Sequence, residues 1–339
     1  MNHFQRYLAE EFAEDYQEGR LNRRQALKLI ASVTGSLVLA ETFLAACAPP
    51  PQATAIPAPT STTPPTDAPT LSPTSTAEPT AEPTVAEAPA TAPSPPTAPV
   101  SGTVSPEDPA IEAGPIQFSG EDAMLMGYLA RPKGDGPFPV VLICHENRGL
   151  TAHIQDVTRR LAKAGYVALA VDLLSRQGGT DAVGSGNVPG ALGNISPDQF
   201  VQDFRSGWQY LQTLPFADAE RVGMVGFCFG GGVTWRMATH MPELKAAVPF
   251  YGPHPPAEDV PNINAAVLAI YGERDQRINQ GIPAVEAAMQ AHGKIYEKVI
   301  YPNADHAFHN DTGSRYNPEA AQDAWARTLA WFGKYLTAP

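Results

Sequence analysis

The chain has 339 residues, 43% of them hydrophobic, which is enough for one large globular domain or two small ones. It carries 23 basic and 35 acidic residues, a formal net charge of −12, and no cluster of lysine and arginine of the kind that neutralises phosphates. This balance argues against nucleic acid as a partner. The cysteines Cys47, Cys144 and Cys228 form no C-x-x-C pair, so they predict neither a disulfide framework nor a metal cluster.

The first 46 residues resemble an export signal. A basic stretch, residues 20–28, contains the pair Arg23 and Arg24 and precedes the largely apolar residues 29–46. Paired arginines ahead of a short apolar run are typical of a twin-arginine signal. The run is too short and too interrupted for a membrane-spanning helix, which needs about 20 apolar residues. We therefore expect residues 1–46 to lie outside the fold.

The predicted signal ends in a motif that resembles a bacterial lipobox, Leu44-Ala45-Ala46-Cys47. In a lipobox the cysteine thiol is lipidated and becomes the mature N-terminus, so the motif predicts an exported, extracytoplasmic protein that a lipid on Cys47 anchors to the membrane. Two alternatives stay open. The segment could remain as a plain N-terminal anchor, or it could be a signal of a soluble protein that is cut near Ala46.

Residues 47–110 are predicted to be a disordered linker. The stretch 48–109 contains 18 of the 35 prolines of the chain, together with threonine, alanine and serine. Such a composition cannot bury enough apolar surface to offset its ordering entropy, and its proline content favours an extended, semi-rigid stalk. The alternative is a proline-rich ligand for a recognition domain.

Residues 111–339 are predicted to form a single α/β domain with a mainly parallel, doubly wound sheet flanked by helices. Short apolar runs alternate with amphipathic stretches, which is typical of βαβ units. Residues 116–129 predict an antiparallel hairpin at the edge of the sheet. The other predicted strands are 139–144, 166–171, 221–227, 246–251, 265–271 and 296–301, and the predicted helices are 154–164, 197–214, 231–241, 282–291 and 318–335.

The sequence Gly226-Phe227-Cys228-Phe229-Gly230 has the spacing of the G-x-S-x-G nucleophile elbow, with sulfur in place of oxygen. A nucleophile elbow is a sharp turn between a strand and a helix, and glycines on either side leave room for it. The helix N-terminus behind Cys228 favours a thiolate. Cys144, by contrast, ends an apolar strand and is expected in the core.

An acid and a histidine follow the elbow in the order that α/β-hydrolases use. Asp275 comes after the strand 265–271, and His306 comes after the last strand. We expect His306 to act as base toward the Cys228 thiol, and Asp275 to orient His306. Glu273 is two residues from Asp275 and is the alternative for that role.

The chain from about residue 111 to 337 resembles the dienelactone hydrolase family. The resemblance lies in the elbow, in Asp275, and in three further motifs: Cys144-His145-Glu146-Asn147-Arg148-Gly149, Asp305-His306-Ala307-Phe308 and Ala324-Trp325-Ala326-Arg327-Thr328. It implies an α/β-hydrolase fold and hydrolysis of a small ester or lactone by the cysteine, through a thioester acyl-enzyme. It implies no cofactor and no metal.

The resemblance also assigns supporting residues. Glu146 would be a second acid that receives the proton of the thiol as substrate binds, and it could instead pair with Arg148. The oxyanion hole would consist of the backbone N–H groups of Phe229 and Asn147. Tyr251, His309 and Arg148 are candidates for contact with substrate.

The chain departs from the family archetype at the substrate carboxylate. The archetype binds that carboxylate with two arginines, one of them four residues after the catalytic histidine, where this chain has Asn310. A carboxylated dienelactone is therefore not the expected substrate unless other arginines replace the pair. The candidates for that replacement are Arg148, Arg274, Arg277 and Arg315. The irregular residues 176–195 are predicted to form the rim of the pocket.

Two other functions stay open at this point. One is an esterase or thioesterase that acts on larger acyl groups, and the other is a membrane-tethered binding protein that keeps the fold without turnover. The partners that we expect are a small ester or lactone and, through Cys47, a membrane. A monomer is the favoured oligomeric state.

Overall fold

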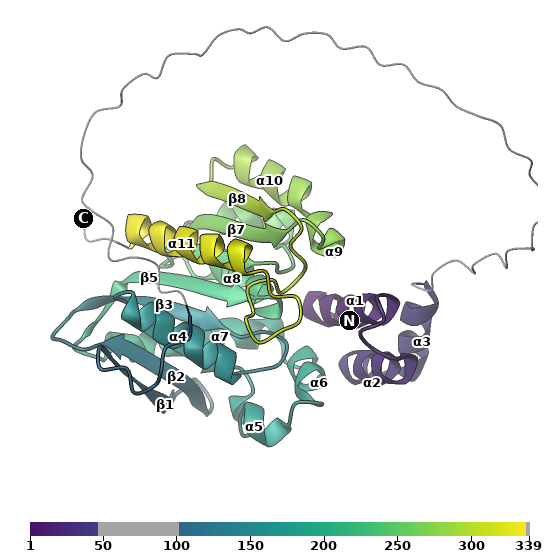
Figure 1. Ribbon diagram of the computed structural model, residues 1–339, viewed down its shortest axis with the longest axis horizontal. Helices are drawn as coiled ribbons and strands as arrows, with labels where there is room; N and C mark the ends of the chain where they lie inside the picture. Colours follow the sequence, from purple (N-terminus) through teal and green to yellow (C-terminus); the bar gives the residue numbers. More distant parts are fainter. Residues whose placement is uncertain (47–101, 337–339) are drawn as a thin grey trace, which may run out of the picture. The chain divides into compact units, whose positions relative to one another are not determined.

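The computed structural model describes residues 1–46 and 102–336. In this part of the chain, eight strands form one sheet in the order β1-β2-β4-β3-β5-β6-β7-β8 (Figure 1). The strands β3 to β8 run parallel, and β1 and β2 form an antiparallel hairpin beside β4. The strands are β1 Ile111–Ser119, β2 Met124–Pro132, β3 Phe138–Cys144, β4 Val167–Asp172, β5 Ala217–Phe227, β6 Ala246–Phe250, β7 Ala266–Gly272 and β8 Tyr296–Tyr301.

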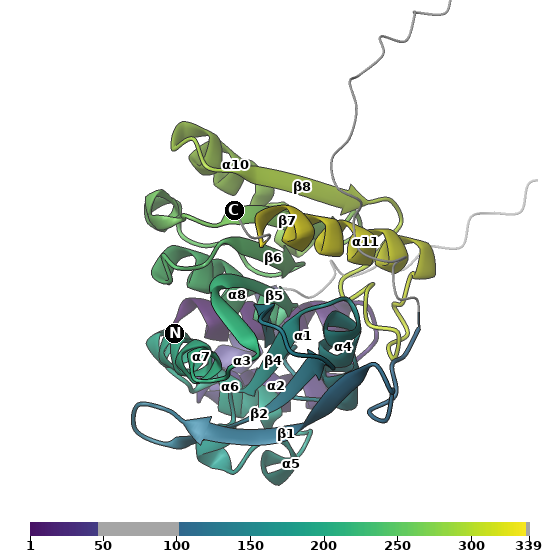
Figure 2. The same ribbon diagram turned by 90° about the vertical axis from the view of Figure 1, so that its left-hand side faces the viewer.

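Helices cover both faces of this sheet. Figure 2 shows α4 and α11 on one face and α7, α8 and α10 on the other. The helices of the sheet domain are α4 Ala152–Lys163, α5 Thr180–Val183, α6 Val188–Gly193, α7 Pro197–Gln212, α8 Phe229–His240, α9 Gln276–Asn279, α10 Ile282–Ala291 and α11 Pro318–Tyr335. Two 3₁₀ turns, η1 Ser175–Gln177 and η2 Ala257–Asn262, complete it. The predicted α/β-hydrolase fold, with its mainly parallel sheet and its edge hairpin, is confirmed.

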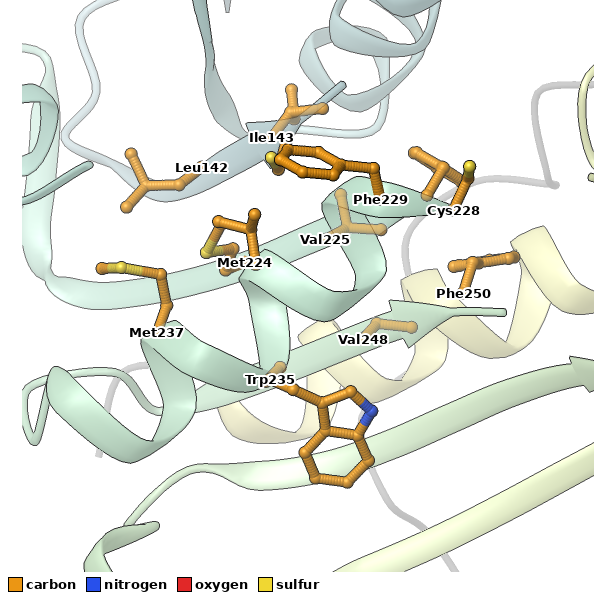
Figure 3. Packing of buried hydrophobic residues seen from close by; sticks show 14 of the residues in the cluster. Leu142, Ile143, Met224, Val225, Cys228, Phe229, Trp235, Met237, Val248 and Phe250 are labelled. Carbon is orange, nitrogen blue, oxygen red and sulfur yellow. The ribbon is translucent and has the colours of Figure 1, made fainter. Parts of the chain in front are cut away.

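The core lies between the central strands and their helices. Because the central strands are covered on both faces, β3 and β6 are apolar throughout, and β5 is buried and without charged residues over 222–227. Figure 3 shows side chains of these strands packed beside Phe229 and Met237 of α8. Close packing of this kind fixes the end of β5 and the start of α8, and the residue between them is Cys228.

Residues 1–46 differ from the expectation that they lie outside the fold. They form three helices, α1 His3–Gln17, α2 Arg23–Thr34 and α3 Leu37–Ala46. A capping box at Asn2 starts α1. The apolar residues Phe4, Tyr7, Leu8 and Phe12 follow a helical period on one face of α1 and are buried in the same core cluster as the sheet. In the described residues, no helix is long and apolar enough to span a membrane.

Two other segments are more ordered than expected. Residues 102–110, placed in the linker by composition, pack along α4: Val104 is buried, and its backbone N–H donates to the Asp156 side chain. The predicted pocket rim, residues 176–195, contains α5 and α6, and α6 packs against α2. The greater part of the predicted linker, and Cys47 with it, lies outside the described residues.

Candidate active site

The elbow after β5 has the strained backbone that a nucleophile elbow requires. Cys228 has φ 57° and ψ −121°, a region that non-glycine residues rarely adopt. A Cβ at Gly226 would lie 2.2 Å from the carbonyl oxygen of Gly230, and a Cβ at Gly230 would lie 2.5 Å from that of Cys144. Only glycine therefore fits at these two positions, which lie two residues before and two residues after the cysteine.

Three side chains from the carboxyl ends of three strands meet at the elbow. His306 Nδ1 donates to Asp275 Oδ2 at 2.5 Å, and a ring nitrogen of the same imidazole lies within 4.8 Å of Cys228 Sγ. All three residues are at most 5% exposed. The three side chains that the sequence predicts as nucleophile, base and acid therefore lie together at the elbow.

Asp275 is held in place by the helix that follows it. Its Oδ1 accepts the backbone N–H of Ile278 and caps α9. Glu273, the alternative, accepts the backbone N–H of Asn303 at 2.8 Å, and in the described part of the chain it forms no hydrogen bond with the imidazole. Asp275 is therefore the carboxylate that orients His306.

The charges of the triad support one another. Burial lowers the pKa of His306, but the charge of Asp275 and its hydrogen bond outweigh burial and raise that pKa to about 10. Burial raises the pKa of the Asp275 carboxyl, and the His306 charge reverses this and holds it below its ordinary value. The pKa of the Cys228 thiol is raised, first by burial and then by the charge of Glu11, against the opposing effect of His306.

Glu146 does not contact the thiol in this structure. Its Oε2 accepts a hydrogen bond from Asn310 Nδ2 at 2.6 Å. Asn310 is the residue that stands where the archetype of the resembling family has an arginine, so this position has acquired a contact with the second acid. Arg148 is exposed, and no ion pair between it and Glu146 is found in the described residues.

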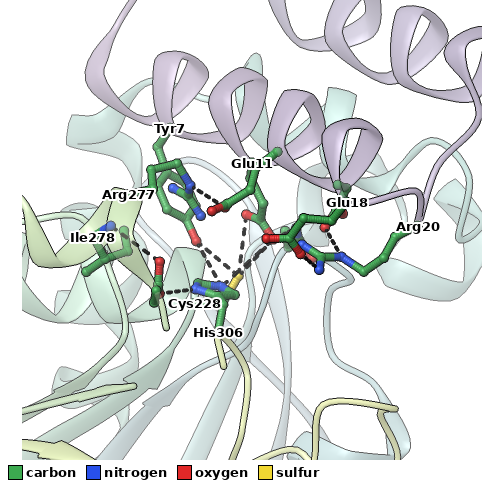
Figure 4. Close-up of polar contacts among 12 residues, drawn as sticks. Tyr7, Glu11, Glu18, Arg20, Cys228, Arg277, Ile278 and His306 are labelled. Atoms are coloured by element: carbon green, nitrogen blue, oxygen red, sulfur yellow. Dashed lines mark hydrogen bonds and ion pairs between the residues drawn. The ribbon is translucent and has the colours of Figure 1, made fainter. Parts of the chain in front are cut away.

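The carboxylate that does contact the thiol comes from α1, and the sequence analysis missed it. Cys228 Sγ lies 3.7 Å from both carboxylate oxygens of Glu11 and 3.2 Å from the Tyr7 hydroxyl (Figure 4). The Tyr7 hydroxyl also lies 3.5 Å from His306 Nε2. The signal that could have found them is the helical period of the apolar residues from Phe4 to Phe12, which an amphipathic helix would show.

The two residues assigned to the oxyanion hole follow the ends of two neighbouring strands, β5 and β3. Phe229 is the first residue of α8, and Asn147 follows Glu146 after β3. The Asn147 side chain donates to Glu11 Oε1 at 3.0 Å, so α1 reaches this part of the site as well.

The candidate substrate contacts have different positions. Tyr251 is buried with φ 36°, and its ring lies 5.0 Å from that of His306. Its hydroxyl has no hydrogen-bond partner among the described residues. His309 stacks on Phe227 in the core behind the elbow, where burial lowers its pKa to about 3. Arg148 is exposed and is not brought to the cysteine.

Two of the four candidate arginines lie at the site. Arg277 is partly buried, its guanidinium lies over the Tyr7 ring, and its Nε donates to Glu14. Its Nη1 and Nη2 atoms have no hydrogen-bond partner within the described ranges. Arg315 Nη1 lies 3.8 Å from Asp15. Arg274 is largely exposed and faces Asp305 instead.

The ligand atoms of Glu11, Cys228 and His306 lie within 4.8 Å of one another, close enough for one metal ion to bind all three. Two of these residues supply the sulfur and the imidazole of the triad. A metal bound here would therefore compete with triad chemistry.

Known proteins resemble this chain over the sheet domain. The sequence model of the dienelactone hydrolase family matches residues 125–336. A protein of Methylorubrum extorquens that is named for carboxymethylenebutenolidase activity is 36% identical over 246 residues, which cover 69% of this chain and 84% of the relative.

Solved structures agree with this match. A Klebsiella pneumoniae protein named as a dienelactone hydrolase superposes with a TM-score of 0.63 at 35% identity, covering 67% of this chain and 100% of the other. P91 from metagenomic libraries, described as a dienelactone hydrolase-like promiscuous phosphotriesterase, gives 0.60 at 25% identity, covering 67% and 99%. With its nucleophile elbow and its matched sheet domain, the chain belongs to the dienelactone hydrolase family.

Proposed function

We propose that this protein hydrolyses a small ester or lactone with Cys228 as the nucleophile, through a thioester acyl-enzyme. The observation that carries the proposal is the position of His306, which hydrogen-bonds Asp275 and has a ring nitrogen within 4.8 Å of the Cys228 sulfur. The strained elbow that presents the sulfur supports it.

The steps follow from these contacts. The raised pKa of His306 favours transfer of the thiol proton to its imidazole, and the resulting thiolate attacks the carbonyl carbon. The backbone N–H groups of Phe229 and Asn147 stabilise the oxyanion that forms. The C–O bond breaks as His306 returns the proton to the leaving oxygen. In a lactone, the leaving hydroxyl stays attached to the acyl group. His306 then takes a proton from water, which attacks the thioester and releases the carboxylic acid and Cys228.

Glu146 is proposed to assist this activation when substrate enters. Its carboxylate is buried and accepts one hydrogen bond from Asn310, with 2.6 Å between Asn310 Nδ2 and Glu146 Oε2. Exchange of that bond for a contact with the thiol would give the sulfur proton a second acceptor.

The arginines at the site favour an acidic substrate. Arg277 has two donor nitrogens that are buried and without a partner among the described residues, and Arg315 lies beside the same helix. A guanidinium binds a carboxylate through two parallel hydrogen bonds. We therefore propose that Arg277 and Arg315 bind the carboxylate of the substrate in place of the arginine that the family archetype has at position 310. A carboxylated ester or lactone would then be preferred over a neutral one.

Hydrolysis of p-nitrophenyl esters of graded acyl length tests the proposal, with a carboxylated dienelactone and a neutral lactone as further substrates. Cys228→Ala and prolonged incubation with iodoacetamide should each abolish the turnover of the full chain, however low that turnover is. Cys144→Ala, which changes a buried cysteine one strand away, should retain it. Activity that survives Cys228→Ala would contradict the mechanism. Preference for long acyl chains over carboxylated substrates would favour the esterase alternative.

We also propose that the protein is exported and lipidated at Cys47. The support is the order of paired arginines, apolar stretch and lipobox in residues 20–47. Metabolic labelling with a fatty acid should mark the wild type and not Cys47→Ala, with Cys144→Ala as the matched control. Label retained by Cys47→Ala would contradict lipidation at this residue.

A further inference from the structure

We propose that α1 is an intramolecular inhibitor, which occupies the substrate site as an acidic and aromatic mimic of substrate and keeps the full chain latent until α1 leaves. This inference rests on the proposed function. It concerns residues that the family match does not cover, because that match begins at residue 125.

The reacting atoms of the triad are all occupied by α1. Tyr7 contacts both the sulfur and the free nitrogen of His306, and Glu11 contacts the sulfur from the other side. The cavity that borders His306 and Asp275 has a volume of about 10 Å³. That is about the space one water needs, whereas small-molecule sites usually offer about 300–1,000 Å³. An ester cannot reach Cys228 while α1 is in place.

The polar contacts of α1 are those that an acidic substrate would make. Glu14 accepts from Arg277, Asp15 lies 3.8 Å from Arg315, and Glu11 accepts from Asn147. These three carboxylates share one face of the helix because they are three and four residues apart. They take up the donors that we assign to substrate.

Aromatic contacts complete the docking. The Phe4 ring lies 5.3 Å from Phe200 and 5.2 Å from Phe229, the first residue of α8. The Tyr7 ring lies under the guanidinium of Arg277. The helix thus uses one aromatic and acidic face against a site that offers aromatic rings and cations, which is specific complementarity.

The charge of Glu11 acts in the same direction as the steric block. It raises the pKa of the Cys228 thiol beyond the effect of burial and so disfavours the thiolate that attacks substrate. Removal of α1 would expose the sulfur and delete this charge together. Cleavage before Cys47, as proposed above, would separate α1 from the sheet domain, so that export and activation would be one event.

The test uses the full chain with substitutions in α1, in buffer that contains EDTA so that a metal at Glu11, Cys228 and His306 cannot be the cause of latency. Phe4→Ser removes the aromatic contact, and Glu14→Gln removes the ion pair with Arg277 at a half-buried position. Arg6→Ser is the matched control, because Arg6 is exposed on the same helix and, among the described residues, its side chain forms an ion pair only with Glu10. Two rates are measured: carbamidomethylation of Cys228 by iodoacetamide, followed by peptide mass spectrometry, and kcat/KM for p-nitrophenyl acetate.

We expect Phe4→Ser to raise both rates by about ten-fold or more, because the open state becomes more populated. Glu14→Gln should raise both by a smaller factor, and Arg6→Ser should stay within about two-fold of the wild type. Near-ultraviolet circular dichroism shows whether Phe4→Ser is folded, and Glu14→Gln carries the test if it is not.

A wild-type chain whose Cys228 is alkylated as fast as in Phe4→Ser and Glu14→Gln would overturn the inference. If the substitutions speed alkylation but no form hydrolyses an ester, α1 covers the cysteine and the proposed function fails instead. The two failures are therefore distinguishable.

Discussion

At the scale of the residue, the site depends on three buried side chains that lie close together. His306 hydrogen-bonds Asp275, and a ring nitrogen of His306 lies within 4.8 Å of the Cys228 sulfur, so each side chain affects the protonation of the next. Buried polar groups of this kind are costly when one member loses its partner.

Asp275→Asn tests the orienting role. The amide cannot balance the charge of the imidazolium, so we expect kcat for an ester substrate to fall by about 1,000-fold or more. Asp305→Asn is the matched control, because Asp305 precedes His306 but its carboxylate is exposed and faces Arg274. Equal activity of Asp275→Asn and the wild type would show that the acid lies elsewhere.

The buried His309 predicts that the free energy of unfolding decreases at acid pH. Its pKa is lowered to about 3 in the fold, because burial favours the neutral ring. The unfolded chain takes up this proton near pH 6.5, so the stabilisation is present above that pH and is lost as the pH falls toward 3, by about 1.4 kcal/mol per pH unit.

His309→Phe keeps an aromatic ring stacked on Phe227. Between pH 6.5 and pH 5, we expect the free energy of unfolding of this variant to decrease by about 2 kcal/mol less than that of the wild type. Urea unfolding at the two pH values measures the difference. The same replacement at the exposed His292 should leave the pH dependence of the wild type unchanged. If His309→Phe and the wild type lost the same free energy of unfolding between the two pH values, a neutral His309 would be contradicted.

At the scale of the element, the elbow between β5 and α8 depends on two glycines that let strand, turn and helix approach closely.

Gly226→Ala should lower the free energy of unfolding by about 3 kcal/mol and abolish turnover, since its Cβ would overlap the Gly230 carbonyl. Gly333→Ala is the matched control: it lies in α11 with open space around it, and we expect about 1 kcal/mol of added stability. Thermal unfolding and an ester assay measure both, and an active, stable Gly226→Ala would contradict the account.

The elements of the sheet domain could be predicted from sequence because their signals are local. Each buried strand is a short apolar run between polar turns, and the predicted helices 282–291 and 318–335 coincide with α10 and α11. The elbow, Asp275 and His306 could be predicted because glycine spacing and chain order mark them. Whether Asp275 or Glu273 contacts the imidazole depends on backbone contacts such as that between Glu273 and Asn303, which no local pattern reveals.

The contacts of α1 could not be predicted in this way. Tyr7 and Cys228 are 221 residues apart, so only the folded chain shows that they touch. The basic and apolar residues that follow α1 also gave the whole segment the pattern of an export signal, and that pattern carries no information about docking.

At the scale of the whole molecule, one described unit contains both the catalytic machinery and the helix that covers it. The acidic face of α1 contacts Arg277 and Arg315, so the same contacts define the latent form and the substrate that we propose.

The ion pairs of α1 predict that a raised salt concentration activates the wild type more than Glu14→Gln, because the variant has already lost one of the ion pairs that salt weakens. Ester hydrolysis across a salt series measures it, and equal salt responses would contradict the ionic part of the docking.

The formation of a thioester on Cys228 is the central claim. The most direct measurement is an acid quench of the Phe4→Ser chain during turnover of p-nitrophenyl acetate, followed by mass spectrometry of the peptide that contains residue 228. We expect one acetyl group on Cys228 in the quenched chain. Acetyl groups confined to other residues, or ester hydrolysis that persists in Cys228→Ala, would contradict it.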